Sequence, residues 1–347
     1  MRRYLLTSSL LLASAVSSVH AAPPRGARAG GPVYVSSCAV MFGVRSSGSS
    51  STRAGLFGNA DAGKMRIDTE VQRIYRFTGA DTATFQRITD ALCGGAPATL
   101  TAAGYQVLTD SAKTHFIWAE KDSAGQTSPQ EQNLGQTRYL VFAPQGTPIG
   151  NPMVVGGIKA VKIQGWDVTI GKQFGLRPVT ILYTVDFASI EALKRNRLVG
   201  QNWASVTAKL AVTVGATITV PDVSDAKCSK GAPFGKYKNR EFCLAKSKMF
   251  EEGTYRTAEE EEQAFTDPIT SVTESTTAGQ KLAEATADLT KALSGIMGQR
   301  SAKTLDIEQF DVAMDMPTYE ARVLEGAKGV LTTAMSAIEN PGQRKKK

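Results

Sequence analysis

Histidine is almost absent from this chain of 347 residues, and its scarcity excludes several kinds of site. The two histidines are His20 and His115, and His20 lies in an N-terminal segment that we expect to be removed. Zinc sites and hydrolytic triads commonly use histidine, so either kind of site would have to rely on His115 here. His115 lies in the apolar run THFIWAE, where a buried structural histidine is the favoured interpretation.

Sequence motifs of catalysis are also missing. The chain has neither the G-x-S-x-G nucleophile elbow nor the G-x-G-x-x-G dinucleotide fingerprint. The segment GNADAGKM comes close to a phosphate-binding P-loop, but Met65 replaces the hydroxyl that binds magnesium. Glu120 and Asp186, near expected strand ends, are candidates for a carboxylate-only hydrolase, although nothing in the sequence singles them out. We therefore expect no cofactor, no metal and, on balance, no enzymatic activity.

Long apolar runs occur only near the N-terminus. Two arginines precede the apolar stretch YLLTSSLLLASAV, and the small residues SSVHAA follow it. This order is typical of a secretory signal peptide that is cleaved after Ala21 or Ala22. A helix that spans a membrane needs about 20 apolar residues, and no later segment supplies them. The sequence predicts a signal peptide over 1–22, a disordered linker over 23–32 and a periplasmic or secreted chain without a transmembrane helix.

The four cysteines are Cys38, Cys93, Cys228 and Cys243, and no two of them have the CxxC spacing of a zinc site. An even number of cysteines in an exported protein predicts disulfides. Four cysteines allow three pairings, of which proximity favours Cys228–Cys243 and leaves Cys38–Cys93. The first bond would close the loop CSKGAPFGKYKNREFC and stabilise the fold by about 3 kcal/mol on the chain-entropy model.

Charge is distributed unevenly along the chain. The formal net charge of +8 includes six basic residues at the two ends, without which it falls to +2, so the charge does not indicate nucleic-acid binding. Residues 227–248 contain seven basic residues against Glu241 alone, whereas residues 251–330 carry a net charge of −9. Two solvated faces that attract each other are the favoured interpretation. The alternative is a basic loop offered to an anionic surface such as lipid headgroups, with Lys230, Lys236, Lys238 and Arg240 as its candidate residues.

Hydrophobic patterning predicts a sheet with flanking helices. Every even position from Val206 to Val220 is apolar, which predicts a strand that Gly215 either bulges or divides. Other predicted strands cover 33–45, 105–108, 114–120, 137–144 and 179–187. Helical spacing predicts helices around Ile67–Tyr75, from the N-cap Asp81 to Leu92, and over 189–197. Polar segments at 46–55 and 121–136 are expected to be loops.

The chain changes character near residue 251. An acidic segment over 251–268 reads as a linker or a frayed helix start, and a helix follows with Leu282, Leu289 and Ile296 seven residues apart. A strand is predicted over 304–316 and a helix after Pro317. We expect both helices to pack in the core. The predicted domains are a disulfide-containing region over 33–250, an acidic helix-strand-helix region over 251–340 and a basic tail over 341–347.

These observations predict an α+β or mixed α/β fold with a central mixed sheet, flanking helices and a smaller helix-rich C-terminal region. The favoured function is a periplasmic, non-enzymatic binding or assembly factor of the cell envelope. Its expected partner is an anionic envelope surface or another envelope protein, and no nucleic acid. One alternative is a secreted hydrolase that uses carboxylates or His115. Another is an oligomeric export component of the outer membrane, because such proteins use strands of about ten alternating residues and this chain has two or three.

Overall fold

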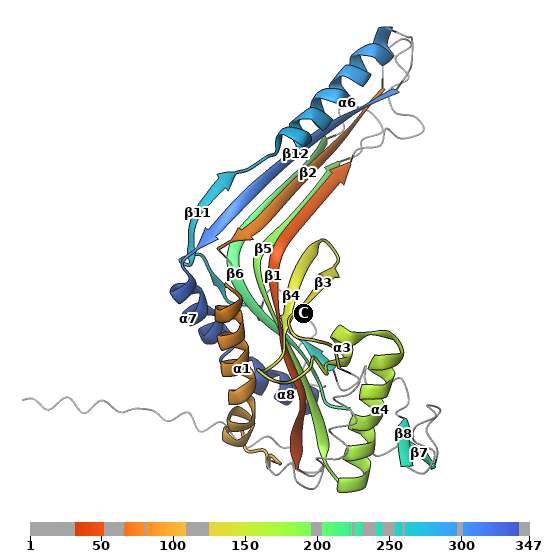
Figure 1. Ribbon diagram of the computed structural model, residues 1–347, viewed down its shortest axis with the longest axis vertical. Coiled ribbons are helices and arrows are strands. Elements are labelled where there is room, and N and C mark those ends of the chain that lie inside the picture. Colours follow the sequence, from red (N-terminus) through yellow and green to blue (C-terminus); the bar gives the residue numbers. More distant parts are fainter. Residues whose placement is uncertain are drawn as a thin grey trace, which may run out of the picture.

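The computed structural model describes residues 32–51, 66–79, 81–108, 125–195, 203–221, 223, 226–230, 241–244, 254–258, 261–296 and 301–339. Several predictions lie outside these residues: the signal peptide, nearly all of the linker, His115, Glu120, Lys236, Lys238, Arg240 and the basic tail. The predicted fold class is confirmed, because helices flank a mixed sheet of ten strands (Figure 1).

The strands of the sheet follow the order β10-β6-β5-β1-β2-β12-β11, with β4 and β3 attached to β1, and β9 attached to β6. Parallel pairs join β1 to β5 and β2 to β12, and the other pairs are antiparallel. Strands from both sides of residue 250 therefore share one sheet. The bounds are β1 (Val33–Ser51), β2 (Arg66–Thr78), β3 (Gln130–Leu134), β4 (Thr137–Phe142), β5 (Arg177–Arg195), β6 (Trp203–Thr219), β9 (Thr254–Arg256), β10 (Ala264–Phe265), β11 (Ile269–Glu274) and β12 (Ser301–Met314).

The helices cover the lower half of the molecule and one side of its upper end (Figure 1). Helices α1 (Thr82–Ala102), α7 (Met316–Gly326) and α8 (Val330–Glu339) lie on one side of the lower sheet. Helices α3 (Pro152–Val155) and α4 (Gly157–Phe174) lie on the other side, with a small second sheet of β7 (Lys227–Lys230) and β8 (Glu241–Leu244). Helix α6 (Ala278–Ile296) runs along β12 at the upper end.

The main core lies between the lower sheet and the helices α1, α7 and α8. The ring of Phe85 on α1 stacks on Phe42 of β1 with centroids 4.3 Å apart. Phe77 of β2 packs against both Phe85 and Tyr319 of α7. These contacts agree with the predicted helix after Asp81, whose carboxylate accepts hydrogen bonds from the backbone N–H groups of Ala83 and Thr84. In the described part of the chain, no helix is both long and apolar enough to cross a membrane.

The upper ends of the strands form an arm that extends beyond the helix-covered core (Figure 1). We define the arm as residues 45–51, 66–76, 188–195, 203–210, 278–296 and 301–309. Strands β1 and β5 pair only as far as Phe42 and Val185, and above that level β1 pairs with β2 while β5 pairs with β6. The two hairpins then pack face to face, because a Cβ atom on Gly48 would lie only 2.3 Å from Cγ2 of Ile190.

The serine-rich segment in the arm is a strand, so the predicted loop is wrong over 46–51. Strand β1 continues to Ser51, and Ser46 and Ser50 are buried. Ser46, Gly48 and Ser50 alternate with outward residues, and the Ser50 hydroxyl donates to the carbonyl of Leu193 at 2.7 Å. Small side chains let the two layers approach closely, whereas the composition of the segment resembles that of a loop.

Two predicted helices are also wrong. The segment that contains Ile67 and Tyr75 forms β2, because it is rich in β-branched and aromatic residues and pairs with β1 and β12 on its two edges. Residues 189–195 extend β5, because each of them pairs with a residue of β6. The alternating pattern of β6 gives one strand, and its pairing passes through Gly215 without interruption.

The C-terminal region differs from the sequence prediction in three places. Helix α6 is present, but Leu282 and Leu289 are 67% and 60% exposed, so the expectation of core packing is wrong there. The opposite side of α6 faces β12, where the Glu284 carboxylate accepts a hydrogen bond from the backbone N–H of Ile307. The helix after Pro317 is two helices, α7 and α8, separated near Gly329, which has a φ of +82°. The acidic segment contributes β9 and β10 to the sheet.

Core packing is confirmed for α7 and α8. The stripe that the sequence predicted for one helix is buried at four positions, which are Val323, Ala327, Leu331 and Ala334.

Candidate functional site

Both pairs of cysteines that proximity favoured are bonded. Cys228 and Cys243 lie opposite each other in β7 and β8, and their sulfur atoms are 2.00 Å apart. The bond joins the two strands at the base of the hairpin that carries the predicted basic loop. Cys38 of β1 and Cys93 of α1 form the second disulfide, with sulfur atoms 2.02 Å apart.

The disulfide arrangement gives a direct prediction for the purified protein. Peptide mapping under non-reducing conditions should recover Cys228 linked to Cys243, Cys38 linked to Cys93, and no free thiol. Recovery of Cys38 linked to Cys228 would contradict the structure. Four free thiols in exported material would contradict both the structure and the expected oxidising compartment.

The β7–β8 hairpin is anchored on α4 by a side chain that fits into a notch. Phe242 is almost fully buried, and its ring meets Trp166 edge to face with centroids 5.3 Å apart. A Cβ atom on Gly165 would lie 2.0 Å from Cζ of Phe242, so the ring occupies the space that a larger residue would fill. The Thr169 hydroxyl accepts a hydrogen bond from the backbone N–H of Cys243 at 2.9 Å. The hairpin therefore has a fixed position on α4.

Lysines are frequent on the elements that form this anchor. Helix α4 carries Lys159, Lys162 and Lys172, and β7 begins and ends with Lys227 and Lys230. The acidic residues of these elements are Asp167, which is buried, and Glu241, which lies opposite Lys230. We call this surface, formed by α4 with β7 and β8, the basic face. Of the candidate residues, Lys230 is the last residue of β7, while Lys236, Lys238 and Arg240 lie outside the described residues.

The acidic C-terminal residues form ion pairs with other elements. Arg73 and Arg76 of β2 pair with Asp306 and Asp311 of β12, at 2.9 and 2.8 Å. Further pairs join Arg87 to Glu320, Arg177 to Glu339 and Arg322 to Asp267. Part of the negative charge of residues 251–330 is thus matched by Arg73, Arg76 and Arg87 rather than by the basic loop.

Asp186 is the one candidate carboxylate within the described residues. It lies on β5 beside a register shift, and the Tyr139 hydroxyl donates to its Oδ2 at 3.1 Å. Its Oδ1 is buried without a hydrogen-bond partner and would lie 2.7 Å from a Cβ atom on Gly43. Burial raises the pKa of Asp186 to about 6, although the Tyr139 hydrogen bond opposes the shift. Burial, and then Asp186, raise the pKa of Tyr319.

The position of Asp186 fits a structural role better than a catalytic one. It lies one residue above the last pair of β1 with β5, where the sheet divides into two layers. Close packing around Gly43 holds the Asp186 carboxyl between Tyr139 and Tyr319, whereas hydrolysis by carboxylates requires two acids on either side of a substrate. Across the described ranges, no group of three or more potential metal ligands occurs.

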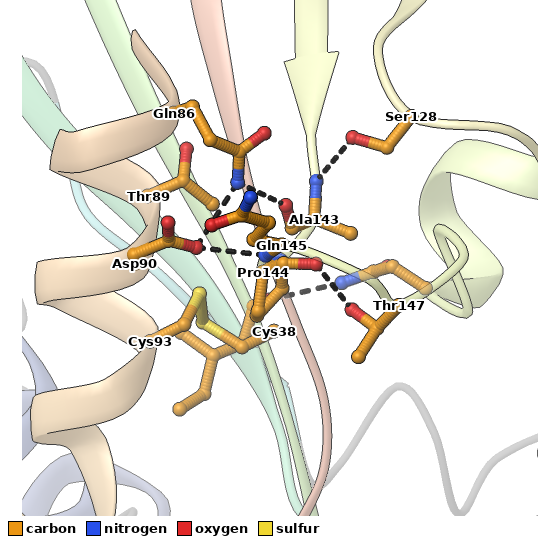
Figure 2. Close-up of a disulfide and its surroundings, with 12 residues drawn as sticks. Cys38, Gln86, Thr89, Asp90, Cys93, Ser128, Ala143, Pro144, Gln145 and Thr147 are labelled. Carbon is orange, nitrogen blue, oxygen red and sulfur yellow. Dashed lines mark hydrogen bonds between the residues drawn. A yellow bond between two sulfur atoms is a disulfide. The ribbon is translucent and has the colours of Figure 1, made fainter. Parts of the chain in front are cut away.

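A pocket is lined by Gln86 of α1 and by the loops on either side of the β3–β4 pair, several of whose residues lie around the Cys38–Cys93 disulfide (Figure 2). Its volume is about 390 Å³, and Gln86, Ser128, Gln145 and Thr147 contribute to its lining. Gln86 donates to the carbonyl of Ala143 at 2.9 Å and to the Asp90 carboxylate at 3.0 Å, and that carboxylate also accepts from the backbone N–H of Gln145 at 2.8 Å. These bonds fasten the loop after β4 to α1, so the polar groups of the pocket serve the structure.

The sequence missed α4, on which the basic face depends. Ile163 to Gly171 are almost all buried although polar residues occur among them, so no amphipathic pattern marks the helix. The available signals were the N-cap Asn151 with Pro152 before the short helix α3, and the glycine pair that follows it.

No family model, curated protein or solved structure matches this chain.

Proposed function

We propose that this is an exported, non-enzymatic protein of the cell envelope that binds an anionic surface through its basic face. One observation carries the proposal: a disulfide-closed hairpin that bears basic residues is fixed on a helix that also bears lysines. Basic residues held together in this way attract anionic headgroups more strongly than the same residues spread over the surface. The two disulfides support an oxidising compartment.

Binding should depend on the basic residues of the hairpin. Replacing Lys230, Lys236, Lys238 and Arg240 by Gln removes attraction worth up to about 1 kcal/mol for each residue near an anionic membrane. We expect the affinity for phosphatidylglycerol vesicles to fall by about 100- to 1,000-fold, with the melting temperature unchanged. Vesicle co-sedimentation measures the affinity, and thermal unfolding measures the stability.

A matched variant controls for net charge. Lys194, Lys209, Arg256 and Lys328 are exposed and lie outside the basic face, so replacing them by Gln removes the same charge. This variant should keep nearly all of its vesicle binding. If the hairpin variant instead loses stability and keeps its binding, the hairpin balances charge within the fold and the proposal is wrong.

One observation favours a second function, assembly with other copies as an oligomeric component of the outer membrane. Within the described residues, β9 and β10 cover the outer edge of β6 only at Val212–Thr213 and Thr217–Thr219. Residues 203–210 therefore pair only with β5, and an unpaired strand edge is a template for another strand. Light scattering on the purified protein, with and without detergent, tests this function: a single monomeric species in both conditions would exclude it.

A further inference from the structure

Helix α4 exposes more large apolar side chains than any other described element. Eight large apolar side chains are exposed in the described part of the chain, and Ile158, Val161 and Phe174 of α4 are three of them. Ile158 is 75% exposed, the largest value of the eight, and Val161 is 46% exposed. The same helix buries Trp166 and Ile170 completely or nearly so, which means that its exposed apolar residues are not a sign of loose packing.

Ile158 and Val161 share a face of α4 with the anchor of the hairpin. The positions 158, 161, 162, 165, 169 and 172 are spaced by three, four, seven, eleven and fourteen residues, which places them along one stripe of a helix. Gly165 and Thr169, in the middle of that stripe, hold the hairpin. The apolar pair therefore continues the hairpin's stripe toward the N-terminus of α4, and Lys162 and Lys172 lie on the same stripe.

Lysines next to exposed apolar side chains match the chemistry of one kind of partner. A bilayer with anionic headgroups offers negative charge at its surface and an apolar layer beneath it. Lysine side chains reach such headgroups while their methylene stems lie against apolar neighbours. A second copy of the same face would bring Lys159 and Lys162 against identical lysines, so charge does not favour self-association here.

We infer that the basic face docks on an anionic lipid bilayer, with Ile158 and Val161 entering the boundary between headgroups and acyl chains. This inference rests on the proposed function, because it specifies which anionic surface is bound. Lys159 and Lys227, which are exposed, lie over the headgroups, and the apolar pair supplies the part of the binding that salt does not screen.

The test compares a bilayer with an anion that has no acyl chains. The probes are vesicles of phosphatidylglycerol and phosphatidylethanolamine, and soluble polyphosphate, each at 0.1 M and 0.5 M NaCl. Protein recovered from the exported fraction is used, together with Ile158→Ser/Val161→Ser and the control Leu282→Ser/Leu289→Ser. The control removes two exposed leucines of α6, which lies far from α4 in the fold (Figure 1).

The Ile158→Ser/Val161→Ser variant should bind polyphosphate as the unmodified protein does and bind vesicles about tenfold or more weakly, with the greater loss at 0.5 M NaCl. The α6 control should bind both probes normally. Equal vesicle binding by the Ile158→Ser/Val161→Ser variant and the unmodified protein would overturn the inference and leave the proposed function standing. An equal loss toward both probes would also overturn it. If the unmodified protein binds neither probe, the proposed function itself is wrong.

Discussion

Gly165→Ala is expected to loosen the β7–β8 hairpin and destabilise the protein by about 1–3 kcal/mol, which is the usual effect of overpacking a well-packed core. The added methyl carbon would lie 2.0 Å from Cζ of Phe242, and two further ring carbons lie within 2.8 Å of it. Phe242 cannot move freely, because Trp166 packs against its ring and the neighbouring Cys243 is held by Thr169. The hairpin must then shift as a unit, although all of its charges are kept.

Two variants make this prediction specific. Gly94→Ala makes the same change in α1, where an added Cβ atom meets nothing within 4 Å, so it should stabilise the helix by about 0.5–1 kcal/mol. Gly165→Ala/Phe242→Ala removes the clash, and its loss should be smaller than the sum of the two single losses. Denaturant unfolding gives these free energies. Additive losses in the double variant would show that Gly165 and Phe242 are not coupled.

Asp186→Asn is expected to stabilise the protein at pH 8 by up to about 3 kcal/mol and to have little effect at pH 4. Burial raises the pKa of this carboxyl from 3.8 to about 6. A group with a raised pKa contributes its full stability below the unfolded pKa, and that stability is lost as pH rises through the folded pKa. At pH 8 the native state therefore holds a charged, partly unpaired carboxylate, which Asn does not have.

The groups around Asp186 determine the sign of this effect. Tyr139 of β4 donates to it, Tyr319 of α7 is within electrostatic range, and Glu262 adds negative charge near Tyr139. None of these groups carries a positive charge that would compensate the carboxylate.

Asp315, the N-cap of α7, shows the opposite behaviour, because hydrogen bonds from Thr318 lower its pKa. Asp315→Ala should therefore destabilise the protein more at pH 7 than at pH 3. Melting curves against pH that show the same trend for both variants would contradict this account.

The sequence predicts those elements whose buried face is marked by large apolar residues. Strand β6 is an example, because Val212, Val214 and Ile218 all lie in the main core and alternate with smaller residues. Helix α1 is another, since its cap and its buried Phe85 and Ile88 fit the helical period. The pairing of the cysteines also follows from the sequence, because Cys228 and Cys243 are the two that lie closest together along the chain.

Two kinds of element could not be predicted from the sequence. One is a strand whose inward residues are small, and the other is a helix that is buried over most of its surface. The upper part of β1 turns Ser46, Gly48 and Ser50 inward, and these residues give no hydrophobic signal. The basic face depends on contact between Phe242 and Gly165, which are far apart in the sequence, so no local pattern reports it. Glycines within the helix, such as Gly165, were a local indication of close packing there.

The most direct measurement of the central claim is flotation of the protein with anionic vesicles after deletion of residues 344–347, the four basic residues of the tail. The deletion removes the concentrated group of basic residues at the C-terminus, so the remaining binding does not come from that group. We predict that the shortened protein floats with phosphatidylglycerol vesicles at 0.05 M NaCl, is partly released at 0.5 M NaCl, and does not bind vesicles of phosphatidylcholine alone. Failure to float with phosphatidylglycerol vesicles at 0.05 M NaCl would contradict the claim that the basic face binds an anionic surface.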